Sequence, residues 1–168
     1  SNFSIYLPNL LAAIFMLYFT YDLHKEIIDN KYPIVSPLIL STTFVWVNYI
    51  NLATQDIVFS SIVTFGIFSC IKYFKNKNNI FLFFTGIWIG LAFMLKTYLT
   101  FIPTLALIPF LIFSKIFNKK IFWIGLAIGF IPFLIWSFKI ISIYGFLSYS
   151  GLFNKLISLS SKNTFTNP

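Results

Sequence analysis

The sequence contains no arginine, four acidic residues and a single cysteine. Charged residues make up 10% of the 168 residues, against roughly 25% in an ordinary soluble domain. Hydrophobic residues make up 58%, so a soluble globular protein is excluded. Cys70 cannot form a disulfide or a multi-cysteine metal site within this chain. Because it lies inside an apolar run, we expect it to face lipid or to pack between helices.

The motifs of soluble nucleotide chemistry are also missing. The sequence has no glycine-rich phosphate loop, no His-Glu metal motif and no nucleophile elbow. The alternating strands of about ten residues that build a membrane barrel are absent as well. The net charge of +8 does not indicate nucleic-acid binding, because most lysines sit in short loops between apolar runs.

Long apolar runs fill the chain instead. A helix crossing a hydrocarbon core about 30 Å thick needs about 20 residues. The pattern predicts six spans at residues 5–21, 33–50, 57–73, 80–95, 97–114 and 121–143, followed by an outer tail at 144–168. One apolar stretch, Ile80 to Phe113, is too long for one crossing, and we expect a tight turn near Lys96. The predicted fold is an all-α polytopic transmembrane bundle forming one domain.

The lysines predict the orientation of this bundle. Eight of the twelve lie in the loops 22–31, 72–79 and 114–120, which six crossings place on one side. By the positive-inside rule that side is cytoplasmic. The protein is then expected in the cell (inner) membrane, with both ends of the chain on the extracytoplasmic side. His24, in the first of these loops, is expected to be solvated. Because the chain opens with Ser1 and enters an apolar run at once, we expect an internal fragment of a longer protein.

The same parity brings three polar positions together at the outer face: residues 48–56, the turn at Lys96 and the end of the sixth span near Lys139. Lys139, Trp136 and Tyr144 fit an ordinary aromatic and basic belt.

Asp56 is the only acid outside the first cytoplasmic loop. It has two interpretations: a helix cap in water, formed by Thr54 or Asp56, or a carboxylate that binds a metal, a sugar or a cation near the headgroups. Lys96 interrupts the longest apolar run. Its ammonium either extends to the interface or meets an anion such as a lipid phosphate. Their predicted position on one face favours a shared site.

Three stretches carry a family resemblance. They are Leu-Pro-Asn-Leu-Leu-Ala (7–12), Ala-Thr-Gln-Asp (53–56) and Gly-Leu-Ala-Phe-Met-Leu-Lys-Thr (90–97). In this order they resemble the GT-C membrane glycosyltransferases of glycosyltransferase family 39, in particular protein O-mannosyltransferases and lipid A aminoarabinose transferases. Residues 130–136 and the following tail resemble the family's seventh span and outer loop.

The resemblance implies an enzyme that transfers a sugar from a polyprenyl-phosphate donor to a lipid, glycan or protein acceptor on the extracytoplasmic face. It places Lys96 near the donor phosphate, where the lysine would offset charge on the leaving group, and gives Asp56 a supporting role. The adjoining Thr97 and Gln55 complete the predicted substrate-binding set.

The chain departs from the family pattern in two ways. The family's main catalytic acid would precede Ser1, so this fragment alone is expected to be inactive. A histidine or arginine expected after the seventh span has no counterpart in residues 144–168. No cofactor is assigned, and a divalent metal in the full-length protein stays open. The alternatives are a transporter or flippase, which would carry polar groups near the bilayer midplane, and a polysaccharide polymerase or ligase, which would carry arginines in its outer loops.

Overall fold

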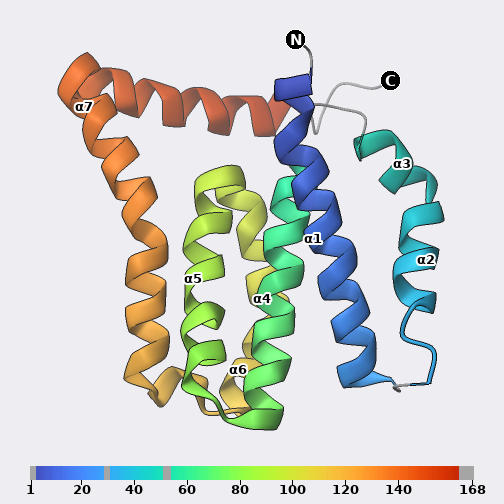
Figure 1. Cartoon of the computed structure of the whole chain (residues 1–168). Coiled ribbons are helices and arrows are strands. Elements are labelled where there is room, and N and C mark those ends of the chain that lie inside the picture. Colours follow the sequence, from blue (N-terminus) through green and yellow to red (C-terminus); the bar gives the residue numbers. More distant parts are fainter. Residues whose placement is uncertain (1–2, 29–30, 51–53, 163–168) are drawn as a thin grey trace. The chain divides into compact units, whose positions relative to one another are not determined.

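The computed structural model describes residues 3–28, 31–50 and 54–162, and all regular structure in these ranges is helical. The all-α prediction is therefore confirmed. The elements are α1 (Phe3–Ile27), α2 (Val35–Thr42), α3 (Phe44–Ile50), α4 (Asp56–Asn76), α5 (Asn79–Lys96), the 3-10 turn η1 (Thr97–Thr100), α6 (Phe101–Phe113), the 3-10 turn η2 (Ile116–Asn118) and α7 (Lys120–Lys162) (Figure 1). The chain forms two compact units, residues 1–130 and 131–168, which are described separately.

Each predicted span coincides with helical structure. Three segments are long and apolar enough to cross a membrane by length and composition: 56–76, 79–113 and 120–145. The six spans and their boundaries stay predictions. Asp29 of the first predicted loop, Ala53 of the resemblance and the end of the predicted tail lie outside the described residues.

The second predicted span is interrupted at Thr43. This residue has extended backbone angles (φ −68°, ψ 137°) between α2 and α3. Hydroxyl groups satisfy carbonyls at the break: Ser41 donates to the Leu38 carbonyl and Thr43 to the Leu40 carbonyl, at 2.9 and 2.8 Å. A break in an apolar helix is tolerated where such side chains replace the lost backbone hydrogen bonds.

The predicted turn near Lys96 is present. Thr97 has φ 26° and ψ −84°, which ends α5, and the chain runs back through η1 into α6 (Figure 1). The 18 residues of α5 are about 27 Å long at ~1.5 Å per residue. This is close to the thickness of the hydrocarbon core, so the division of the long apolar stretch is physically reasonable.

Glycines allow α5 and α7 to approach closely in the first unit. Gly86 and Gly90 of α5 face Gly125 and Gly129 at the start of α7. A Cβ atom added to Gly90 would lie 2.2 Å from the Gly129 carbonyl carbon, and one added to Gly125 would lie 2.2 Å from the Phe83 oxygen. Two small-xxx-small patterns therefore let the backbones approach, as in membrane helix pairs.

α4 lies at the centre of the first unit, between α1 and α5. Gly66 of α4 accommodates the buried Trp88 ring of α5, since a Cβ at Gly66 would lie 2.3 Å from ring atoms. Cys70 is fully buried in the main apolar cluster with Tyr73 and Leu82. Of the two expectations for Cys70, the structure shows packing between helices.

An ion-pair network links the ends of α1 and α4. Glu26 pairs with Lys72 at 2.8 Å and with Lys75 at 3.2 Å, and the Lys75 ammonium also donates to the Glu26 carbonyl. The Lys72 hydrogen bond lowers the pKa of the Glu26 carboxyl, and Lys75 adds to this shift. His24, expected to be solvated, is partly exposed, and its ring forms a hydrogen bond with the Ser36 hydroxyl at 2.6 Å.

In the second unit, the helix does not end where the tail was expected. Gly145 has φ 77° and ψ 161°, a conformation open mainly to glycine, and the ribbon bends sharply there (Figure 1). The chain then continues as helix to Lys162. Residues 146–162 of the predicted tail are therefore helical. Lys139, Trp136 and Tyr144 are all exposed, which is compatible with the predicted belt.

Candidate functional site

An ion pair joins two of the predicted site residues. Asp56 is the first residue of α4 and Lys96 the last residue of α5. Only Lys77 and Asn78 separate the two helices along the chain, so they form a hairpin and bring these distant ends to the same level. The Lys96 Nζ atom lies 2.7 Å from Asp56 Oδ1. The predicted convergence of this aspartate and this lysine is present in the structure.

The pair is only partly shielded from its surroundings. The Asp56 side chain is 39% exposed and the Lys96 side chain 26%. At this exposure an ion pair contributes at most about 1 kcal/mol to stability. Its larger effect is local: the carboxylate compensates an ammonium that follows a long apolar helix, where an unpaired charge is costly. A polar, accessible group is thereby held at one end of the bundle.

The capping interpretation of Asp56 is wrong. The N-cap of α4 is Gln55, whose side chain makes no capping hydrogen bond. The Asp56 carboxylate pairs with Lys96 instead of covering the helix amides. Gln55 itself is exposed, so its amide is accessible next to the ion pair.

Thr97 occupies the strained position of the site. A positive φ is unfavourable for a β-branched residue, and such strain is often found at functional sites. Thr97 is half-buried and places Lys96 at the point of chain reversal. The four predicted residues thus lie on two adjacent helix ends, with Asp56 and Lys96 in direct contact.

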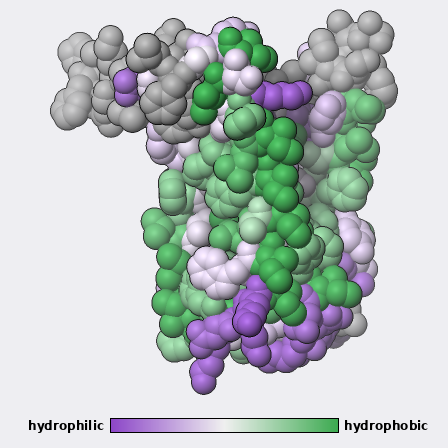
Figure 2. All heavy atoms as spheres, turned by 90° about the vertical axis from the view of Figure 1, so that its left-hand side faces the viewer, coloured by the Kyte–Doolittle hydropathy of each residue, from purple (hydrophilic) through white to green (hydrophobic). Residues whose placement is uncertain are grey.

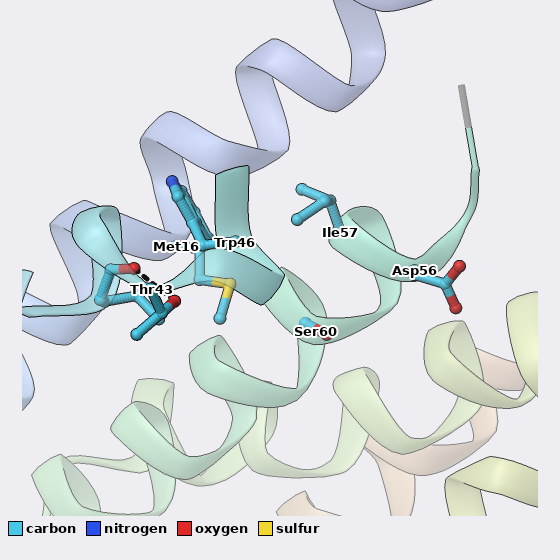
Figure 3. A pocket seen from close by; sticks show the side chains of 7 residues that line it. Met16, Thr43, Trp46, Asp56, Ile57 and Ser60 are labelled. Carbon is cyan, nitrogen blue, oxygen red and sulfur yellow. Dashed lines mark hydrogen bonds between the residues drawn. The ribbon is translucent and has the colours of Figure 1, made fainter. Parts of the chain in front are cut away.

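A pocket of about 280 Å³ opens beside Asp56, between α1, the α2–α3 pair and α4. Figure 3 shows the Asp56 carboxylate pointing away from Met16 and Trp46, which line the pocket from the opposite side. Its walls are mostly apolar, with hydroxyl groups from Thr43 and Ser60.

This pocket was not predicted from the sequence. Its only available signal was the Ser-Thr-Thr run at 41–43, which marks the helix break that shapes one wall. Spacing along the chain does not reveal that α1 and α3 approach α4 at the same place.

A second hollow of about 310 Å³ lies between α4 and α6. Ser60 borders both hollows, and Pro103 and Ala106 line the α6 side of this one. Apolar space is therefore available on two sides of α4, close to its charged end. An amphipathic molecule with an anionic head and an apolar tail would find both kinds of surface here.

No group of three or more His, Cys, Asp or Glu side chains that could hold a metal ion occurs among the described residues. The donors present near the ion pair are one carboxylate, hydroxyls and an amide.

Comparison with known proteins gives one finding. A family model described as dolichyl-phosphate-mannose-protein mannosyltransferase matches residues 1–136, which include the ion pair, both hollows and the glycine contact. No curated protein and no solved structure matches the chain.

Proposed function

The chain belongs to the dolichyl-phosphate-mannose-protein mannosyltransferase family, and from that premise we propose that it forms part of the site of a membrane glycosyltransferase. The donor is a polyprenyl-phosphate sugar, and the acceptor is a lipid, glycan or protein on the extracytoplasmic face. Family membership and three apolar segments long enough to cross a membrane support a membrane location. A multi-pass arrangement in the cell (inner) membrane, with both ends of the chain outside, remains part of the proposal.

The ion pair at 2.7 Å between Asp56 and Lys96 carries the proposal. In glycosyl transfer from such a donor, the bond between the anomeric carbon and the phosphate oxygen breaks, and its electron pair stays on the phosphate. The leaving group therefore gains negative charge. A lysine ammonium close to that oxygen stabilises the developing charge and lowers the barrier. We assign this role to Lys96.

Asp56 positions the Lys96 ammonium before the donor binds and receives it again after the product leaves. Because a carboxylate and a phosphate compete for the same ammonium, the pair must loosen when the donor arrives. Because both side chains are partly exposed, breaking the ion pair costs little free energy. Gln55 and Thr97, on either side of the pair in sequence, supply hydrogen-bonding groups to the donor or acceptor.

The hollows beside α4 give the donor's apolar part a place to lie. The pocket bordered by Met16, Trp46 and Ile57 is mostly apolar and adjoins Asp56. An isoprenoid chain placed there keeps the phosphate near the helix ends. The acceptor group that attacks the anomeric carbon loses a proton, and a carboxylate acting as general base in the full-length protein would take it.

One observation favours a second function, that of a transporter or flippase. The interrupted α2–α3 helix borders the pocket, and interrupted helices line substrate sites in many transporters. The family match and the position of the charges at a helix end, rather than in mid-helix, favour the transferase.

The test uses the full-length protein in proteoliposomes, with turnover of a polyprenyl-phosphate sugar as the readout. We expect Lys96→Ala and Asp56→Asn each to reduce transfer by orders of magnitude while the amount of folded protein is unchanged. Lys25→Ala, which changes an exposed lysine at the end of α1, is the matched control and should keep full turnover. Full turnover in both site variants would remove the assignment.

A further inference from the structure

The lysine-rich end of the first unit divides into two groups of different electrostatic character. Lys72 and Lys75 are paired with the Glu26 carboxylate. Lys77, Lys115, Lys119 and Lys120, named here the basic cluster, have no carboxylate partner within the described part of the chain. All four are exposed. The basic cluster therefore carries four positive charges that no carboxylate of the described residues neutralises.

The loops that carry the basic cluster pack on apolar side chains of α4 and α6. Lys77 directly follows α4, and its ammonium lies 4.6 Å from the centroid of the Phe74 ring. That ring contacts Phe110 of α6 at 5.3 Å between centroids. The other three lysines follow α6 and flank Ile116, which is fully buried in the same cluster as Tyr73 of α4. Packing thus holds the two loops that carry the lysines at one end.

Large apolar side chains next to the basic cluster are exposed rather than buried. Phe113 is 86% exposed, and Trp123 is 51% exposed while its indole N–H donates to the Phe117 carbonyl at 2.8 Å. Figure 2 shows hydrophilic side chains gathered at one end of the molecule, below a mainly hydrophobic surface. Aromatic side chains beside lysines are typical of the level of lipid headgroups.

We propose that the basic cluster binds the headgroup of an anionic phospholipid such as phosphatidylglycerol. Lysine ammonium groups attract the phosphate as point charges. The exposed Phe113 and Trp123 contact the acyl chains. A soluble anion would use the lysines and leave this apolar surface uncovered, so the combination selects an amphipathic partner. The site is separate from the ion pair, because the two lie at opposite ends of α4 and α5.

The test measures lipid binding by the full-length protein in a nonionic detergent, using native mass spectrometry. Phosphatidylglycerol and phosphatidylcholine of the same acyl composition are added in parallel. We expect the wild type to retain phosphatidylglycerol, and the triple variant Lys115→Gln, Lys119→Gln, Lys120→Gln to bind it at least tenfold more weakly. The matched triple variant with arginine at the same positions should bind as the wild type does. Equal binding by the glutamine variant would overturn the proposal.

A second measurement uses the wild-type protein alone, so it does not depend on whether a variant folds. A photoactivatable phosphatidylglycerol is crosslinked to the wild-type protein, and the modified peptide is identified. We expect label between residues 112 and 123. Label elsewhere, equal retention of phosphatidylcholine, or displacement of the lipid by millimolar inorganic phosphate alone would contradict a phospholipid site.

Discussion

Replacement of Gly90 by alanine tests the packing on which the first unit depends. A Cβ atom at this position would lie 2.2 Å from the Gly129 carbonyl carbon and 2.5 Å from the Phe130 nitrogen. Contacts below 3.0 Å are essentially never observed, so the two backbones must separate by roughly 1 Å. Overpacking of this kind costs about 1–3 kcal/mol. The higher helix propensity of alanine offsets about 1 kcal/mol. Because backbone atoms and not a movable side chain are in the way, the overpacking cost lies near the upper end of this range, which leaves a net destabilisation of about 2 kcal/mol.

The assay is an SDS titration of the purified protein in mixed micelles, followed by circular dichroism. Gly151→Ala is the matched control, since a Cβ there meets nothing within 4 Å; this variant should unfold at the wild-type SDS fraction or slightly above it. The double variant Gly90→Ala, Gly129→Ala should lose less than the sum of the single losses, because one separation of the helices relieves both contacts. Identical unfolding of Gly90→Ala and Gly151→Ala would refute the close approach of α5 and α7.

Two further predictions concern α4. Glu26 has a lowered pKa, so its ion pairs stabilise the folded protein above the ordinary carboxyl pKa of 4.5, and this contribution is lost as the pH falls through the folded-state value. Glu26→Gln should therefore lower the thermal midpoint at pH 7, with a loss in folding free energy of about 1 kcal/mol or less. The difference in midpoint from the wild type should vanish well below pH 4.5. A difference that persists at that pH would contradict the linkage between protonation of Glu26 and stability. Gly66→Ala should quench or shift the fluorescence of Trp88, because the added methyl group occupies the position of the indole ring. A tryptophan spectrum and a thermal midpoint like those of the wild type would show that the ring does not pack on Gly66.

The candidate site was predictable in part because topology alone relates Asp56 to Lys96. Two consecutive helices joined by a short turn place the start of the first beside the end of the second. The residues at those ends can therefore be matched from the spacing of the apolar runs. The sequence pattern also places these two residues on the side opposite the lysine-rich loops. One predicted crossing, α4 or α5, lies between each of them and the loop at 72–79.

Other features depend on side-chain packing that spacing does not reveal. Of the two interpretations of Asp56, the capping role is not the one observed, because the carboxylate pairs with the Lys96 ammonium. His24 was expected in water, yet Ser36 from the next helix reaches its ring. Both outcomes are decided by a partner that lies on a different helix.

Hydrophobic run length and the distribution of lysine determined the class of this protein, the helical segments and the turn at Lys96, because the cost of burying backbone polar groups and charges in lipid acts on each segment by itself. Tertiary structure alone decided which helices touch: the close approach of α5 and α7 at their glycines, the pocket against the interrupted α2–α3 pair, and the neutralisation of Lys72 and Lys75 but not of the basic cluster. These depend on the rotation and depth of one helix against another. That geometry depends on how many side chains pack together at once, so the hydrophobic periodicity of a single helix does not predict it.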